Sequence, residues 1–180
     1  DIDFGTYPYV TSSNTMAGGS LTGSGLPMSA VDRIIAIVKA FQTRVGSGPF
    51  PTEETGEIGN TLRHGGPVGE FGATTGRPRR CGWIDLPQLK YTIMLNGVDE
   101  LALTKIDVLN TFATIKAATH YHLDGKDTDS VPFEMVENIP LVYREFPGWE
   151  ADTDACLQRQ DLPQALQDYL YFLEEVLETP

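Results

Sequence analysis

A short apolar run, Leu101-Ala102-Leu103, constrains the fold more than any other stretch, because it leads directly into residues 104–107, three of which are polar or charged. Consecutive apolar residues of this kind are typical of a strand that is buried on both faces. In α/β proteins, ligands bind beyond the carboxyl ends of such strands. The run therefore predicts an α/β fold with a binding site at residues 104–107.

Lys105 and Asp107 have the spacing of a guanine-recognition motif, in which a strand ends in Asn or Thr, Lys, any residue and Asp. The Asp107 carboxylate can accept hydrogen bonds from the N1–H and the exocyclic amine of guanine, whereas adenine presents a different edge. The stem of Lys105 can lie along the base. The other interpretation is an ordinary strand-to-loop junction.

A second cluster lies between Glu70 and Trp83, where Arg77, Arg79 and Arg80 fall within four positions. Glycines and hydroxyls precede these arginines, so the backbone can approach a ligand and offer donors. Guanidinium groups bind carboxylates and phosphates through paired hydrogen bonds. The stretch indicates an anion-binding loop, and the alternative is a solvated basic turn.

The composition restricts the partners, because the formal net charge is −12. Nucleic acids and anionic membranes require a broad basic face, so neither is expected as a partner. The longest aliphatic run, residues 34–38, is too short to span a bilayer. Cys81 and Cys156 fit neither a disulfide framework nor a metal-binding pattern. We therefore expect a cytoplasmic chain in a reducing compartment.

Periodicity and capping residues predict three helices. The first is expected from Ser29 to Phe41, since its apolar residues recur at helical spacing. The second begins after Asp85 and ends at Gly97, and the third begins near Pro163. All three are amphipathic or apolar, so we expect them to flank a sheet.

The rest of the chain is expected to form strands and loops. Residues 115–123 and 141–146 are predicted strands, and together they form an antiparallel portion over residues 115–146. Residues 4–27 are rich in Gly, Ser, Thr and Asn, which predicts loops. Residues 53–64 are expected to form a short polar helix.

Several isolated polar residues leave two interpretations open. His64 is expected to interact with a helix C-terminus rather than to act in catalysis. His120 and His122 lie on one strand face, and a satisfied surface pair is favoured over a metal site. Arg44 faces a ligand or is an ordinary strand-edge charge. The hydroxyls of residues 11–13 bind a phosphate or form local backbone bonds.

Five stretches of the sequence match the motifs of one protein family, and they occur in the same order as in that family. They are Asp1-Ile2-Asp3-Phe4-Gly5-Thr6-Tyr7-Pro8-Tyr9-Val10-Thr11-Ser12-Ser13-Asn14, the stretch from Thr43 to Glu53, Gly72 to Trp83, Leu103 to Leu109, and Pro147-Gly148-Trp149. In this order they resemble the adenylosuccinate synthetase family, closely over most of residues 1–117 and more sparsely to about residue 178. The resemblance implies a P-loop-NTPase-like α/β fold with a mostly parallel central sheet and flanking helices, which is incomplete here.

The resemblance also implies an activity. It implies a GTP-dependent ligase that joins IMP and L-aspartate to give adenylosuccinate, GDP and phosphate in AMP biosynthesis. GTP would phosphorylate the 6-oxygen of IMP, and the aspartate amine would displace the phosphate. Mg²⁺ as cofactor, a homodimer of the full-length enzyme and a cytoplasmic location are implied as well.

Individual residues receive roles from the same resemblance. Thr11 would contact the IMP phosphate, Val45 would approach IMP through its backbone, and Arg77 would also touch IMP. The loop Ala73-Thr74-Thr75-Gly76-Arg77-Pro78-Arg79 would close over aspartate. Arg79 would lie against GTP, and Lys105, Ile106 and Asp107 would bind its guanine.

The resemblance places other parts of the site outside this chain. The family's phosphate-binding loop, magnesium ligands, catalytic aspartate and catalytic histidine are expected upstream of residue 1. Residues 1–180 are therefore expected to be the central-to-C-terminal part of one domain, with no catalytic or metal-binding residue of their own and inactive without the rest of the polypeptide. The alternatives are a purine-nucleotide-binding module without chemistry and a structural fragment.

Overall fold

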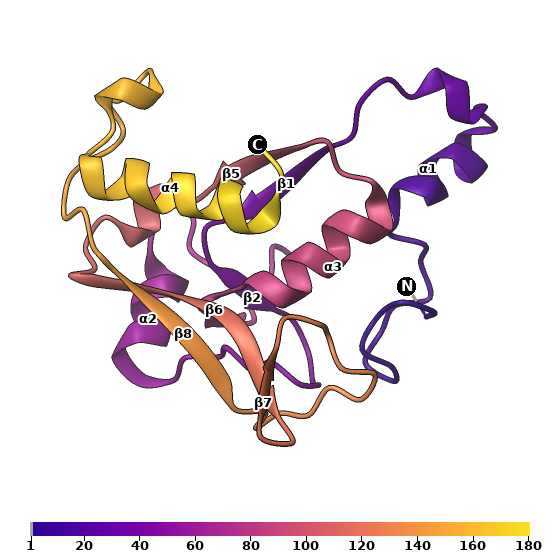
Figure 1. Ribbon diagram of the computed structural model, residues 1–180, viewed down its shortest axis with the longest axis horizontal. Helices are drawn as coiled ribbons and strands as arrows, with labels where there is room; N and C mark the ends of the chain where they lie inside the picture. The colour runs from indigo at the N-terminus through magenta and orange to yellow at the C-terminus, as the bar shows by residue number, and fades with distance from the viewer. Residues whose placement is uncertain (1) are drawn as a thin grey trace.

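The computed structural model describes residues 2–180 of the chain (Figure 1), so Asp1 of the first motif lies outside the described residues. The helical elements are α1 (Ala17–Ser24), η1 (Met28–Ala30), α2 (Gly56–His64), α3 (Leu86–Asn96), η2 (Ile106–Leu109), η3 (Arg159–Asp161) and α4 (Gln164–Leu177). The strands are β1 (Ile35–Lys39), β2 (Gln42–Arg44), β3 (Arg80–Gly82), β4 (Ile84–Asp85), β5 (Glu100–Thr104), β6 (Thr114–Leu123), β7 (Lys126–Thr128) and β8 (Leu141–Pro147).

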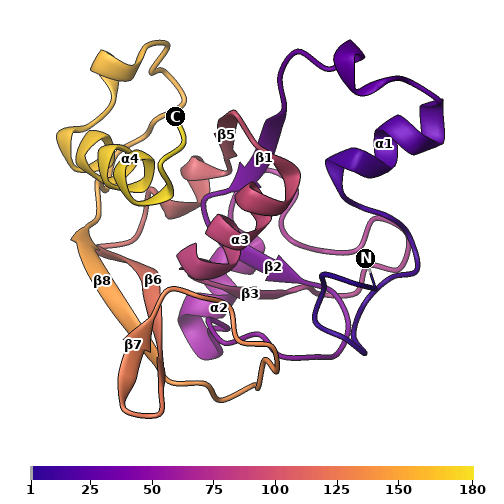
Figure 2. The same ribbon diagram turned by 45° about the vertical axis from the view of Figure 1, so that its right-hand side comes forward.

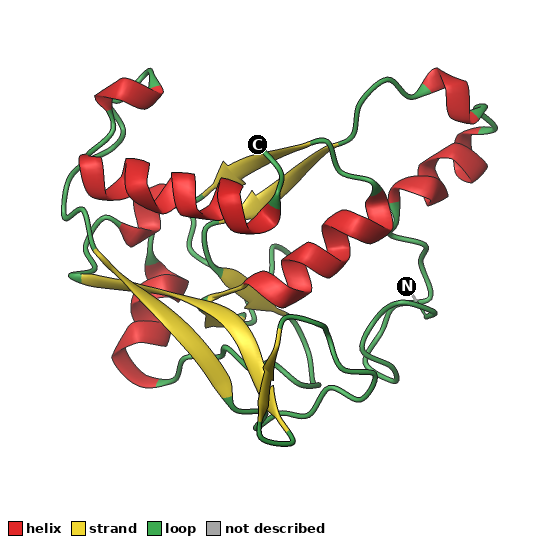
Figure 3. Cartoon of the chain, viewed as in Figure 1, coloured by secondary structure: helices red, strands yellow, loops and turns green. Residues whose placement is uncertain are grey.

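The strands form three small sheets, and the expected α/β class is confirmed (Figure 3). β1 pairs in parallel with β5, and β4 pairs in parallel with β6. β6 also pairs antiparallel with β7 and β8, which confirms the antiparallel portion expected over residues 115–146. A further antiparallel pair joins β2 to β3. Because β1 and β5 run in the same direction, Lys39 and Thr104 end the two strands at the same edge.

Helix α3 begins and ends where the capping residues predict. The Asp85 side chain accepts a hydrogen bond from the backbone N–H of Gln88, as an N-cap residue does. Gly97 ends the helix in the left-handed conformation, with φ of 59°. The Tyr121 hydroxyl donates to both carboxylate oxygens of Asp85 at 2.9 Å, which ties α3 to β6.

The prediction of a helix from Ser29 to Phe41 is wrong. The structure has only the short turn η1 there, followed by strand β1. Residues 34–38 are mostly β-branched, and such side chains fit a pleated strand better than a helix. A continuous apolar run has no periodicity that separates a buried strand from a helix.

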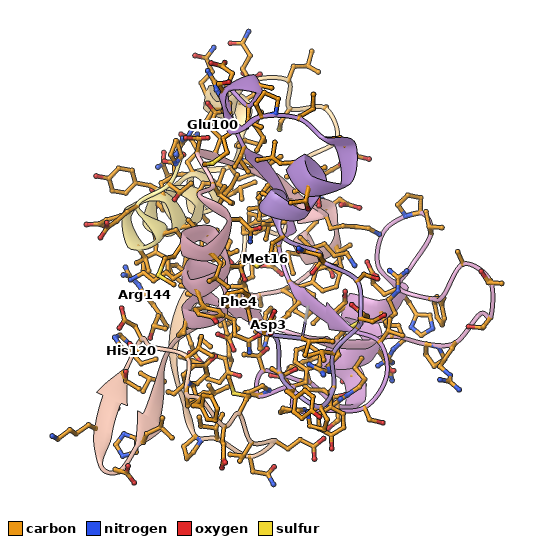
Figure 4. The ribbon with its side chains drawn as sticks, turned by 90° about the vertical axis from the view of Figure 1, so that its right-hand side faces the viewer. Asp3, Phe4, Met16, Glu100, His120 and Arg144 are labelled. Atoms are coloured by element: carbon orange, nitrogen blue, oxygen red, sulfur yellow. The ribbon has the colours of Figure 1, made fainter. Side chains whose placement is uncertain are left out.

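One part of the hydrophobic core lies where α4 packs against β8 and α3. Phe146 makes an edge contact with Tyr169, with ring centroids 5.1 Å apart, and the Arg144 guanidinium stacks over Phe172 at 4.3 Å. Arg144 lies on the same side of the molecule as His120, in the lower left of Figure 4. α4 thus fastens the antiparallel strands to the rest of the fold.

The N-terminal segment projects from this body. Residues 17–24, expected as a loop, form α1, which has no buried residue and projects at the upper right of Figure 1. The backbone N–H of Ala17 donates to the Asn96 side chain at 2.7 Å, so the start of α1 is fixed to the end of α3. Residues 2–14, which precede α1, lie against the body beside the ends of β2 and β3 (Figure 2). Within residues 2–180, no helix is long and apolar enough to cross a membrane.

Candidate active site

The Glu70 carboxylate is buried, with its side chain only 1% exposed, and lies among three cationic side chains. Its Oε2 atom accepts hydrogen bonds from Lys39 Nζ at 2.8 Å and from Arg79 Nη1. Lys105 Nζ lies 3.8 Å from Oε1. Lys39 ends β1 and Lys105 follows β5, so the parallel pairing of these strands brings both lysines to one carboxylate.

The charge state of Glu70 follows from these contacts. Burial by itself raises the pKa of the carboxyl group, because it disfavours the charged form. The hydrogen bonds and the positive charges of Lys39 and Arg79 outweigh burial, so the pKa of Glu70 lies below its ordinary value. Glu70 is therefore ionised and serves as the counter-ion of the cluster.

The predicted anion-binding loop has a fixed neck at Glu70 and Arg79. The Arg79 N–H donates to the Glu70 carbonyl at 3.0 Å, and the Glu70 N–H donates to the Arg63 carbonyl. Phe71 and Pro78 form an antiparallel bridge next to this pair. The neck is therefore held by backbone hydrogen bonds and by the ion pair between the same two residues, Glu70 and Arg79.

The tip of the loop, residues 73–78, is exposed. Two backbone hydrogen bonds define it, from the Gly72 N–H to the Arg77 carbonyl and from the Gly76 N–H to the Gly72 carbonyl, both at 2.8 Å. Gly76 has a φ of 63°, a conformation that favours glycine. The Arg77 guanidinium forms no hydrogen bond or ion pair within residues 2–180, so it is free to meet a ligand.

The predicted guanine motif lies immediately beside this cluster. Lys105 adopts the left-handed conformation, with φ of 63°, and η2 begins at the next residue. A Cβ atom added at Gly66 would lie 3.0 Å from Asp107 Oδ2 and 3.4 Å from Lys105 Nζ, so both side chains lie against this glycine. The Asp107 carboxylate has no hydrogen-bond or ion-pair partner in the described part of the chain, and it is only partly exposed.

A second cluster joins the N-terminal segment to β2. The Arg44 guanidinium donates to Thr6 Oγ1 at 3.3 and 3.4 Å, to the Tyr9 carbonyl at 3.3 Å, and to the Ser47 carbonyl at 3.1 Å. Burial, and then the charge of Arg80, lower the pKa of Arg44. Arg44 thus fixes residues 6–9 against the turn that follows β2, and its side chain points to protein partners rather than to solvent.

Arg80 connects the two clusters. It is the cross-strand partner of Arg44 in the β2–β3 pair, and it follows Arg79 directly. Its guanidinium donates to Glu53, which raises the pKa of Arg80, and it also donates to the Gly48 carbonyl at 2.6 Å. β3 therefore links the neck of the arginine loop to the turn between β2 and α2.

Comparison with known proteins decides the family. A family model described as adenylosuccinate synthetase matches residues 1–180. The chain belongs to this family. An adenylosuccinate synthetase from Salinibacter ruber is 55% identical over 181 residues, covering 99% of this chain and 40% of the relative. One from Schizosaccharomyces japonicus is 49% identical and covers 100% and 42%.

A solved structure agrees with the family match. The fully ligated adenylosuccinate synthetase from Plasmodium falciparum has a TM-score of 0.92 and 40% sequence identity, covering 100% of this chain and 43% of that chain. The chain thus spans about two fifths of the length of the adenylosuccinate synthetases it matches.

The structure groups some residues that the resemblance to adenylosuccinate synthetase singles out. It brings Arg79 and Lys105 to one carboxylate and places Asp107 beside Lys105. Val45, 67% exposed, directly follows Arg44, and Thr11 lies exposed two residues after Tyr9. No hydrogen bond or ion pair between described residues joins the side chain of Thr11, Val45 or Arg77 to the predicted guanine motif.

Sequence reasoning missed two members of the site, Glu70 and Lys39. Glu70 stands at the start of the arginine stretch, but no sequence signal shows that this carboxylate is buried. Lys39 falls inside the helix predicted from Ser29 to Phe41, whereas the structure places it at the end of strand β1. A strand prediction for residues 35–39 would have placed this lysine at the same edge as Lys105.

The histidines lie outside these clusters. His64, in the last turn of α2, contacts the Asn60 carbonyl through Nδ1 at 2.9 Å, as the structural interpretation predicts. His122 pairs with Asp127 across the β6–β7 hairpin. Within residues 2–180, no group of three or more His, Cys, Asp or Glu side chains could hold a metal ion.

Proposed function

We propose that this chain is part of a GTP-dependent ligase that joins IMP and L-aspartate to give adenylosuccinate, GDP and phosphate in AMP biosynthesis. The observation that carries the proposal is the convergence at Glu70, where the neck of the arginine loop meets the lysine of the guanine motif. Membership of the adenylosuccinate synthetase family supports the same reaction.

In this proposal the γ-phosphoryl group of GTP moves to the 6-oxygen of IMP, and the aspartate amine then displaces the phosphate. Residues 73–79 close over aspartate, and Arg77 pairs with its carboxylates, because a guanidinium forms two parallel hydrogen bonds with such a group. Arg79, at the neck, offsets the negative charge of GTP. Positioning and charge neutralisation account for most of the catalysis in phosphoryl transfer.

The nucleotide-binding residues follow from the same geometry. Asp107 has an unpaired carboxylate for the N1–H and amine of guanine, and Lys105 lies next to it with its ammonium group toward Glu70. For IMP, we propose contacts from the Thr11 hydroxyl, the Val45 backbone and Arg77. Exposure of these residues is consistent with ligand contact.

The remaining partners belong to the whole enzyme. We propose that the rest of the polypeptide supplies the phosphate-binding loop and the Mg²⁺ ligands, and that the full-length enzyme is a homodimer in the cytoplasm. Cys81 and Cys156 are free thiols, which fits a reducing compartment.

The test is a steady-state assay of the full-length enzyme that contains this chain. We expect adenylosuccinate to form only when IMP, aspartate and GTP are all present. Asp107→Asn should raise the KM for GTP about 10- to 100-fold and leave the KM for IMP unchanged, because an amide cannot accept both guanine hydrogens. Asp129→Asn, at an exposed ion pair with Lys90, is the matched control. A folded full-length enzyme that forms no product would refute the proposal.

A further inference from the structure

We propose that Glu70 is a positioning residue of this site, which locks the neck of the aspartate-binding loop to the lysine of the guanine motif. The inference rests on the proposed function, because that function defines what the loop and the lysine bind. Glu70 does not touch substrate in this proposal. It sets the relative position of the groups that do.

The first argument comes from the segments that Glu70 connects. Lys39 lies at the end of β1, Arg79 at the end of the loop, and Lys105 after β5. These three residues are far apart in sequence, and their contacts with one carboxylate bring their segments together. A shift of Glu70 would therefore move the loop neck and the guanine lysine relative to each other.

The second argument comes from electrostatics. One carboxylate faces three cations, so the cluster keeps a net positive charge that suits an anionic ligand. Without the carboxylate, Lys39, Arg79 and Lys105 would repel one another in a partly buried space. The removal of one partner from a buried ion pair leaves uncompensated charge, which is strongly unfavourable.

The third argument excludes a catalytic role for Glu70. Its side chain is 1% exposed, and its Oε2 atom already accepts from Lys39 and Arg79. A general base must reach the proton that it removes, and a carboxylate that is closed off and ionised by its neighbours is poorly placed for that. The geometry therefore fits orientation of other groups rather than proton transfer.

The experiment uses the full-length enzyme and three variants, Glu70→Gln, Glu70→Asp and the double variant Glu70→Gln with Lys39→Met. In Glu70→Gln we expect the KM values for GTP and aspartate to rise roughly 10- to 100-fold, because small misplacement of binding groups has effects of that size. The KM for IMP should change less than twofold. Glu70→Asp keeps the charge and should recover part of the loss.

The double variant separates positioning from stability. Lys39→Met removes one of the cations left unpaired by Glu70→Gln, so the melting temperature should recover toward the wild-type value. The KM values for GTP and aspartate should stay raised, because Arg79 and Lys105 still lack their anchor. If both KM values also return to normal, Glu70 serves only as the counter-ion of Lys39 and the proposal is overturned.

Two further outcomes keep this test distinct from that of the proposed function. An active wild-type enzyme whose Glu70→Gln variant keeps normal KM values for GTP and aspartate would overturn the role of Glu70 alone. An inactive wild-type enzyme would overturn the proposed function. Glu145→Gln, which breaks an exposed ion pair with Lys116, is the control and should leave all KM values unchanged.

Discussion

Arg44 offers a direct test of how the proposed IMP side of the site is built. Its guanidinium holds Thr6 and Tyr9 of the N-terminal segment against the turn at Ser47. The proposed phosphate contact, Thr11, lies two residues after Tyr9. We therefore expect Arg44→Met to release this segment and to weaken IMP binding, while binding of GTP and aspartate is largely retained.

The magnitude follows from the contacts that join Arg44 to the segment. They run to Thr6 Oγ1 and to the Tyr9 carbonyl at 3.3 to 3.4 Å, which is long for hydrogen bonds. Contacts at the weak end of the usual range contribute about 1–2 kcal/mol together. That free energy corresponds to a rise of about 5- to 30-fold in the KM for IMP.

The loss of Arg44 should change folding stability less than it changes binding. Arg80 is its cross-strand partner, so Arg44→Met also relieves repulsion between two like charges, and Arg80 keeps its pairing with Glu53. A large decrease in the melting temperature would therefore indicate a different role for Arg44.

The assay varies IMP at saturating GTP and aspartate in the full-length enzyme. Arg33→Met is the matched control, because it breaks an ion pair with Glu100 at the other end of the β1–β5 pair. Thr6→Ala should give part of the effect, and it should add little in the Arg44→Met background because both changes break the same contact. If Arg44→Met leaves the KM for IMP within twofold of wild type, the reasoning is refuted.

The remaining predictions concern stability, measured by urea unfolding of the full-length enzyme. Asp85→Ala should lower the free energy of unfolding by about 2–4 kcal/mol, because it removes a helix cap and leaves the buried Tyr121 hydroxyl without an acceptor. Adding Tyr121→Phe to Asp85→Ala should recover about 1 kcal/mol. Equal stability of the single and the double variant would contradict this. Burial raises the pKa of Asp85 despite its hydrogen bonds, so the folded state holds the carboxyl proton more tightly than the unfolded state does. The stability of the wild type relative to Asp85→Asn should therefore fall as the pH rises from the ordinary aspartate pKa through the raised one. The opposite slope would show that folding lowers the pKa of Asp85. The buried Tyr169 hydroxyl has no hydrogen-bond partner within residues 2–180, so Tyr169→Phe should raise stability by about 1 kcal/mol, and a decrease would indicate a bound water.

The elements that the sequence predicts well are those whose ends have local chemistry. Asp85 and Gly97 bound α3, Pro163 precedes α4, and the turn after β6 falls at residues 124–125. Each of these signals acts within a few residues, so it is visible without the fold. The strand end at Thr104 belongs to the same class, because the polar residues that follow the apolar run of β5 mark it locally.

The parts that the sequence does not predict depend on contacts between distant residues. β1 is a strand because its backbone pairs with β5, and its residues Ile35 and Ile37 are exposed, which the apolar run alone does not indicate. α1 contains three glycines and buries no residue, so its composition favours a loop. Glu70 is unremarkable in sequence, and only the folded chain shows that three cations meet at its carboxylate.

The arginine loop combines a fixed neck with a free tip, and this combination bears on how it works. Residues 73–78 are exposed and held mainly by two short backbone hydrogen bonds, so opening or closing the tip breaks few contacts. Movement that reached the neck would separate Glu70 from Arg79 and disturb Lys105 as well. We therefore expect the proposed closure over aspartate to occur within the tip, while Glu70 keeps the loop in register with the proposed nucleotide site. A loop of this construction can exclude water from a reactive intermediate without altering the proposed guanine site.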